Sequence, residues 1–128
     1  MRELKKMGKA YNIDLAPEPL KKDTFELLVE RGLIDIEDEK DNYLSIGYSP
    51  VRDDGISCIQ AARMDENYRV EIIVDGYDGQ PFHIYARNDV PFEEALELFY
   101  AVCVQFLAVD YMSWEDVTHS VKYLEKRY

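Results

Sequence analysis

The pattern of apolar and polar positions divides the chain into short alternating segments followed by a long apolar stripe. Four segments, at about 43–49, 56–64, 68–75 and 82–88, alternate with the two-residue period of a half-buried strand. The connectors between them are short and rich in turn-forming residues. Connections this brief join antiparallel neighbours, because a parallel pair needs a long crossover. The sequence therefore predicts a four-stranded antiparallel meander within residues 43–88.

Helical patterns flank the predicted meander on its N-terminal side. Residues 1–22 form a basic N-terminal segment, and residues 2–9 within it predict a short helix. The stretch LAPEPL interrupts the chain before a second helix within 23–33, where Gly32 is expected to be a positive-φ cap. The N-terminal third thus predicts two helices.

Two more helices are predicted within residues 91–127, after the meander. The first covers about 91–108, and its apolar stripe is typical of a core helix. Ser113 and Asp116 resemble a capping box that opens the second. We expect a single domain over 1–128 of the α+β class, with a four-stranded antiparallel meander sheet and helices packed on one of its faces.

The stretch VDGYDGQ at 74–80 is the nearest approach to a chemical motif. Read as an EF-hand loop that starts at Asp75, it offers Tyr77, Gly79 and Ala86 at the next ligand positions, so only Asp75 fits. A phosphate-binding glycine loop must open a helix, whereas an extended segment follows here. Asp-Gly pairs between alternating segments indicate a hairpin turn. We expect no metal and no cofactor.

Alternation across this hairpin predicts which side chains share each face of the sheet. One face is expected to carry Tyr68, Val70, Ile72, Val74, Phe82, Ile84 and Ala86. The opposite face is expected to carry Arg69, Glu71, Ile73, His83, Tyr85 and Arg87.

The charge distribution indicates what kind of partner the protein would bind. The net charge of −11 divides into +3 for residues 1–22, −16 for 23–121 and +2 for 122–128. A strongly acidic body repels phosphate backbones and anionic lipid, and it attracts basic proteins. We therefore expect no nucleic-acid or membrane partner, and a basic protein partner instead.

The compartment follows from what the sequence lacks. The basic start has no apolar segment behind it, so a secretory signal is not expected, and the apolar run 98–109 is too short to cross a bilayer. Cys58 and Cys103 lie far apart and are expected to be buried, reduced thiols. These features predict a soluble cytoplasmic protein.

Catalytic chemistry has few candidates. The two histidines, His83 and His119, have no neighbour at metal-ligand spacing. An alternative hypothesis is a small enzyme in which His83, Tyr85 and Glu71 meet on one sheet face, as alternation allows. No paired carboxylates are placed for hydrolysis, since the acidic pairs fall in turns or at a helix start.

The acidic run 35–41 directly precedes Tyr43, and it is either a solvated loop or a contact surface. Acidic loops beside tyrosines are typical of a surface for a cationic protein, because tyrosine is enriched in interface centres. The candidate partner-binding residues are Asp35, Glu37, Asp38, Glu39, Asp41, Tyr43, Tyr48, Asp53, Asp54 and Tyr85.

A hairpin (RVEIIVDGYDGQPFHIYAR), a helix (VPFEEALELFYAV) and a tryptophan segment (DYMSWEDV) follow one another within residues 68–117. This order resembles small acidic immunity proteins of bacterial toxin-immunity pairs. The resemblance implies an inhibitor without enzymatic activity that binds and neutralises a cognate, basic toxin domain. A structural subunit of an oligomer, such as a homodimer through the apolar helix 91–108, is a third hypothesis.

Overall fold

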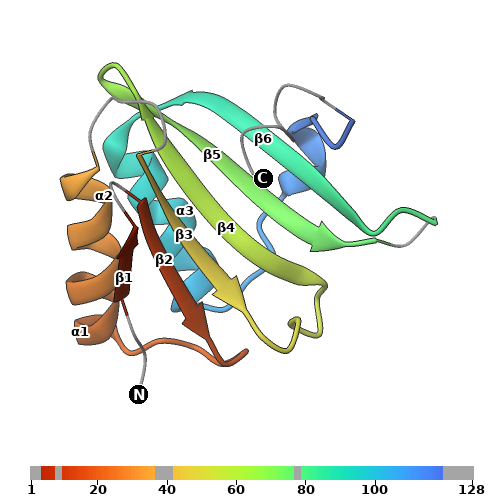
Figure 1. Ribbon diagram of the computed structural model, residues 1–128, viewed down its shortest axis with the longest axis horizontal. Helices are drawn as coiled ribbons and strands as arrows, with labels where there is room; N and C mark the ends of the chain where they lie inside the picture. Colours follow the sequence, from red (N-terminus) through yellow and green to blue (C-terminus); the bar gives the residue numbers. More distant parts are fainter. Residues whose placement is uncertain (1–3, 8–9, 37–41, 77–78, 120–128) are drawn as a thin grey trace.

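The computed structural model describes residues 4–7, 10–36, 42–76 and 79–119, and in these ranges the chain has an α+β fold (Figure 1). A mostly antiparallel mixed sheet carries two helices on one face. The described strands, which lie side by side in chain order, are β1 (Leu4–Met7), β2 (Ala10–Leu15), β3 (Tyr43–Tyr48), β4 (Ile56–Met64), β5 (Asn67–Asp75), β6 (Phe82–Val90) and the two-residue β7 (Glu115–Asp116). Only β2 and β3 are parallel neighbours.

The predicted meander is confirmed as strands β3 to β6, and its bounds agree with the sequence pattern to within two residues. Burial alternates in β3 because one of its faces is packed against the helices, whereas the central residues of β4, β5 and β6 are buried on both faces. On β3, for example, Leu44, Ile46 and Tyr48 are buried while the residues between them are half-buried. The meander is the centre of a wider sheet, since two strands precede it.

The prediction of a helix at residues 2–9 is wrong, because residues 4–7 form β1, which pairs with β2. β2 alternates as well, with Ile13 and Leu15 buried on the helix face. It pairs in parallel with β3, and the long helix between them is the crossover that a parallel pair requires.

The crossover helix consists of α1 (Lys22–Phe25), the π-helical segment η1 (Glu26–Glu30) and α2 (Arg31–Asp35), which follow one another without a break. Gly32 is not its cap. This glycine is buried inside the helix, and a Cβ there would lie 2.9 Å from Cδ1 of Leu44. Gly32 therefore allows close approach of the helix to β3, and the helix ends at Asp35.

The predicted core helix is α3 (Phe92–Cys103), which begins after Pro91 and stops short of the expected residue 108. Its buried stripe is Ala95, Phe99, Val102 and Cys103. The ring of Tyr100 packs edge-on against Phe25 of α1, with ring centroids 5.3 Å apart. Much of the apolar surface of α3 is thus covered by the chain's own sheet and first helix. No helix within the described ranges is long and apolar enough to cross a membrane.

The prediction of a final helix is wrong for the part of it that the structure describes. Residues 111–113 form a short 3-10 turn, and residues 115–116 form β7 against β6. Asp116 does not cap a helix; its Oδ1 accepts hydrogen bonds from the backbone N–H (2.9 Å) and the hydroxyl (2.6 Å) of Thr118. The Thr118 hydroxyl oxygen in turn accepts the N–H of Ile84 at 2.9 Å. Residues 120–128 lie outside the described residues.

The predicted hairpin between β5 and β6 is confirmed, but its predicted faces are wrong for β6. Val74 pairs with His83 and Ile72 with Tyr85, so Tyr85 shares the helix face with Ile72. Ile84 and Ala86 then lie on the opposite face, in a second apolar cluster. A one-residue difference in register moves every side chain of a strand to the other face.

Candidate functional site

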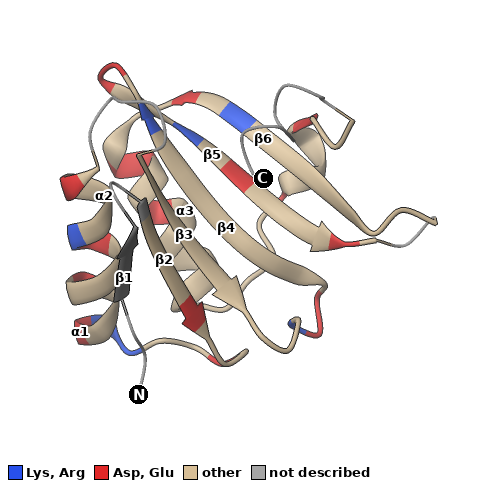
Figure 2. Ribbon diagram, in the orientation of Figure 1, with Lys and Arg blue, Asp and Glu red and all other residues tan. Residues whose placement is uncertain are grey.

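The strongest candidate site is one end of the sheet, where exposed carboxylates from several elements meet. In an antiparallel meander, the start of β3, the β4–β5 turn and the end of β6 fall at the same end, and the end of α2 leads into β3. Figure 2 shows acidic segments at this end on α2, on the β4–β5 turn, on β6 and at the start of α3 (Phe92–Cys103). We call it the acidic end and define it by five exposed residues: Asp35, Asp65, Glu66, Asp89 and Glu93.

Tyr68, at the start of β5, holds the acidic end together from inside. Its hydroxyl donates a hydrogen bond of 2.8 Å to the carbonyl of Leu33 in α2. Its ring lies 6.1 Å from the ring of Phe92 at the start of α3, and the guanidinium of Arg63 lies 5.5 Å from its centroid. One buried tyrosine therefore fixes the positions of two helix ends relative to the β4–β5 turn. Burial raises the pKa of Tyr68, so the hydroxyl stays protonated and able to donate.

The described basic side chains of this region are engaged within the chain. Arg63 donates to the carbonyl of Asp65 at 3.0 Å and covers the ring of Tyr68. Arg87 forms a salt bridge with Glu94. By formal charge the acidic end remains negative, since five carboxylates define it and the charge of Arg87 is paired with Glu94.

Two apolar side chains are also exposed at this end, one on each side of the sheet. Ile34 of α2 is 53% exposed, and Met64 at the end of β4 is 50% exposed. Tyr43 at the start of β3 is half-buried at the same end. A contact surface typically combines such an apolar centre with a charged rim.

Replacing Tyr68 with phenylalanine is expected to lower the free energy of unfolding by roughly 1–2 kcal/mol, because the buried carbonyl of Leu33 would lose its donor. The ring contacts would be kept. Urea denaturation measures the effect, and Tyr100→Phe is the matched control, since its half-buried ring against Phe25 is retained. Equal stabilities for the two variants would show that the hydroxyl does not hold the acidic end.

The predicted partner-binding residues fall in different places. Asp35 and Tyr43 lie at the acidic end, whereas residues 37–41, which include Glu37, Asp38, Glu39 and Asp41, lie outside the described residues. The expectation that Tyr48 and Tyr85 are outer, exposed residues is wrong. Each is only 5% exposed, and both belong to the core cluster on the helix face.

Asp53 and Asp54 lie at the other end of the sheet, in the turn between β3 and β4. Asp54 is engaged by Arg52, whose Nε and Nη2 donate to its two carboxylate oxygens at 3.1 and 2.7 Å. Asp53 is exposed. The structure therefore does not bring this turn together with Asp35 and Tyr43.

Arg52 is 2% exposed and ties that turn to the end of α3. Its Nη1 donates to the carbonyl of Val102 at 2.7 Å, and its guanidinium lies 3.7 Å from the ring centroid of Phe106. Phe106 has a φ of 59°, so the chain reverses there after the helix. Nearby, burial raises the pKa of Cys103 to about 12 and also raises the pKa of Tyr48. This cluster has a structural role, because the charge of Arg52 is compensated by Asp54 within the chain.

The alternative site of His83, Tyr85 and Glu71 is not assembled. His83 and Tyr85 lie on the helix face with nearly parallel rings 6.3 Å apart, whereas Glu71 points to the opposite face. The carboxylate near His83 is that of Asp116, whose Oδ2 lies 3.7 Å from Nδ1. The hydrogen bond from the Thr118 hydroxyl lowers the pKa of Asp116. In the described part of the chain, no group of three His, Cys, Asp or Glu side chains is placed to hold a metal ion.

A row of polar side chains crosses the opposite face of the sheet. Glu71, 6% exposed, accepts hydrogen bonds from Nε2 of Gln60 at 2.6 Å and from Nε of Arg69 at 2.9 Å. Arg69 also donates to Oδ1 of Asn88 at 3.1 Å, and the Cys58 thiol lies 3.1 Å from the Ser45 hydroxyl. Because both carboxylate oxygens of Glu71 accept hydrogen bonds, the row stabilises the sheet and provides no evident reactive group.

Sequence reasoning missed most of the acidic end. Asp65 and Glu66, and Glu93 with its neighbour, were interpreted separately as a solvated turn and a helix start. The signal was present in the predicted topology, because alternate connectors of a meander fall at the same end of the sheet. Grouping the acidic residues by the end of the sheet at which each is expected would have placed Asp65, Glu66 and Glu93 together with Asp35.

The chain was compared with protein-family models, curated proteins and solved structures, and no match was found in any of them.

Proposed function

We propose that the protein is a non-enzymatic binding module that receives a positively charged protein at its acidic end. The observation that carries the proposal is that exposed carboxylates from four elements lie at one end of the sheet, where Ile34 and Met64 are also exposed, one on each side of the sheet. The negative charge would accelerate and orient encounter with a basic partner, while contact with the exposed Ile34 or Met64 side chain would slow its dissociation.

The charge of the sheet and α3 supports a cationic partner. Residues 42–119 contain four basic and fourteen acidic side chains, a net charge of −10. Three of the four basic side chains, Arg52, Arg69 and Arg87, form salt bridges with carboxylates of their own chain. The fourth, Arg63, covers Tyr68. A partner would therefore meet unbalanced negative charge.

The kind of binder that we propose is an immunity protein that neutralises a cognate basic toxin in the cytoplasm. This part of the proposal depends on the resemblance of residues 68–117 to small acidic immunity proteins. The acidic run 35–41 would extend the surface, because it joins α2 to β3, two of the elements that meet at the acidic end.

The other two hypotheses have less support. An enzyme built on His83, Tyr85 and Glu71 would need these side chains on one face, and alternation separates Glu71 from the other two. A homodimer through residues 91–108 would need an uncovered apolar helix, whereas the stripe of α3 packs on its own sheet.

The test is charge reversal with a matched control. A protein captured at low salt is first identified and purified, and its dissociation constant is measured by calorimetry at two salt concentrations. The double variant Asp65→Lys, Glu66→Lys is expected to bind at least about tenfold more weakly at low salt, because it reverses part of the rim. The double variant Glu18→Lys, Asp53→Lys makes the same charge change at the other end of the sheet and should stay within about threefold of the parent.

A partner that is not basic, or equal losses in the two double variants, would contradict the proposal. For the immunity role, the captured protein is expected to have a toxic activity that one equivalent of this protein abolishes. A partner whose activity is unaffected would leave a binder of another kind and remove the immunity assignment.

A further inference from the structure

The outer edge of β6 is only partly paired. β7 covers two residues of this strand, with Tyr85 opposite Asp116 and Ala86 opposite Glu115. β6 continues from Arg87 to Val90, and among the described residues no strand pairs with this stretch on its outer side. A shallow hollow of about 390 Å³ lies where the pairing stops.

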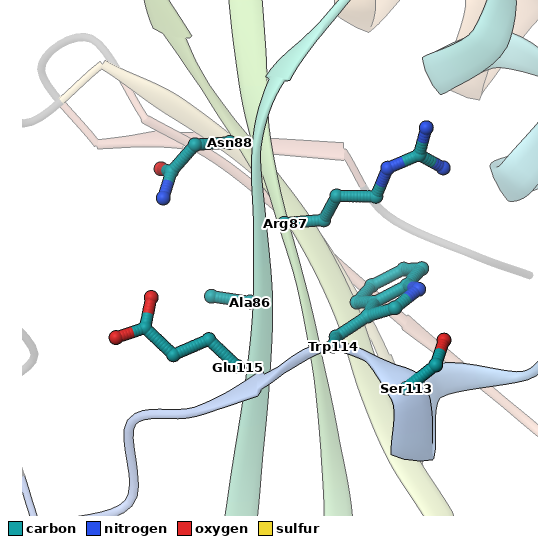
Figure 3. A pocket seen from close by; sticks show the side chains of 6 residues that line it. All are labelled: Ala86, Arg87, Asn88, Ser113, Trp114 and Glu115. Atoms are coloured by element: carbon teal, nitrogen blue, oxygen red, sulfur yellow. The ribbon is translucent and has the colours of Figure 1, made fainter.

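Figure 3 shows that the hollow has two different sides, one on each face of the sheet. On one side lie Trp114 and Arg87, and the charge of Arg87 is balanced by its salt bridge with Glu94. On the other side lie Asn88 and the exposed carboxylate of Glu115. The first side is thus aromatic with its charge compensated, and the second is acidic.

The direction of the backbone N–H and C=O groups along β6 determines which of them are available at its open edge. The N–H of Val117 donates to the carbonyl of Ile84 at 2.9 Å, so the peptide groups of Ile84 point towards β7. In an antiparallel ladder this orientation recurs every second residue, which directs the peptide groups of Ala86 to the same edge. Continued alternation would bring the N–H and C=O of Asn88 to the hollow, just before the bulge where Asp89 has a φ of 55° and the register against β5 shifts.

We propose that this hollow, which we call the β6 notch, docks an extended segment of a protein partner that adds to the sheet beside β7. A strand added to an edge gains affinity from main-chain hydrogen bonds and specificity from alternate side chains. The two sides of the notch fit such alternation, because successive side chains of an extended segment point to opposite faces. The inference builds on the proposed function, since it specifies which part of a basic partner is bound.

The chemistry of the two sides selects an alternating basic and apolar segment. A lysine or arginine on one face would pair with Glu115, while an apolar neighbour on the other face would cover the ring of Trp114. The notch adjoins the acidic end, because β6 runs from the notch to Asp89 and into α3. A partner strand in the notch could therefore belong to the same contact as the acidic rim.

Trp114 is the sole tryptophan of the chain, so intrinsic fluorescence reports directly on the notch. The probe is a capped five-residue peptide of alternating lysine and valine. Its matched control is the same peptide with alternate backbone amides N-methylated, which keeps the charge but removes donors to the strand edge. The lysine-valine peptide is expected to shift Trp114 emission saturably to shorter wavelength, and the methylated control to bind at least about tenfold more weakly.

A pair of charge reversals checks the acidic side of the notch. Glu115→Lys is expected to weaken the peptide at least about fivefold, whereas Glu97→Lys, an equal change at an exposed position on α3, should stay within about twofold. Equal binding of the two peptides, binding without a change in Trp114 emission, or no saturable shift up to about 1 mM peptide would each overturn the notch proposal. The acidic end would be unaffected by these results, because the reversal of Asp65 and Glu66 tests it with the captured partner.

Discussion

Replacement of Arg52 by methionine is expected to lower the free energy of unfolding by about 3 kcal/mol, the largest loss that we expect from a single polar substitution in the described chain. The variant leaves the buried carbonyl of Val102 without its donor and removes the cation from the ring of Phe106. It also releases Asp54, which is exposed enough to regain water. The loss of stability would come mainly from breaking the contacts by which Arg52 connects the β3–β4 turn to the end of α3.

Urea denaturation followed by circular dichroism measures this change, with Arg63→Met as the matched control. Arg63 is half-buried, covers one ring and donates one exposed hydrogen bond, so its replacement is expected to cost less than about 1 kcal/mol. Similar losses for both variants would show that burial of the Arg52 guanidinium contributes nothing special to stability.

Alkaline pH is expected to unfold the protein through its buried thiol. The pKa of Cys103 is raised to about 12 by burial, from an ordinary value of 9.0. Between these two pH values the unfolded chain has lost the thiol proton while the folded chain keeps it, so stability falls as pH rises. The expected slope is about 1.4 kcal/mol per pH unit from this group, beginning near pH 9. Tyr48 and Tyr68, whose pKa values are also raised by burial, add to the loss above about pH 10.

Stability measured by urea denaturation at intervals from pH 8 to 11 checks this slope. Cys103→Val keeps a similar volume and removes the proton, so its stability is expected to stay level until the tyrosines titrate, near pH 10. Parallel curves for the parent and the valine variant would show that the thiol is not the group that titrates. The difference between the curves, rather than either absolute stability, carries the result.

The meander was predictable because its signals are local. Alternating apolar residues and short turns lie within each hairpin, so strands β3 to β6 appeared in the sequence at nearly their observed bounds. β2 was missed although Tyr11, Ile13 and Leu15 alternate, because its parallel partner β3 lies beyond a whole helix. A pairing that depends on such a distant segment cannot be inferred from a local pattern.

The most consequential error in predicting the candidate site was the face of the sheet assigned to the β6 side chains. The loop from Gly76 to Pro81 determines the register, and the sequence does not specify how many of its residues continue the strands. Gly76 is where the loop closes on itself, since a Cβ there would overlap the carbonyl of Gln80. The resulting register places Tyr85 inside. The electrostatic part of the site needed only charge and topology, so Asp35 lies at the acidic end, as does Tyr43, whereas Tyr48 and Tyr85 are buried in the core.

The parallel pairing of β2 with β3 also determines what an incomplete chain would expose. β3 is the outermost strand of the meander on that side, and among the described residues it is β2 that pairs with its outer row of peptide groups. A protease that cut the linker between β2 and α1 and released the first fifteen residues would leave this row bare. An unprotected strand edge recruits other chains. We therefore expect the N-terminal hairpin to protect the protein against aggregation, independently of any partner that binds at the β6 edge of the sheet.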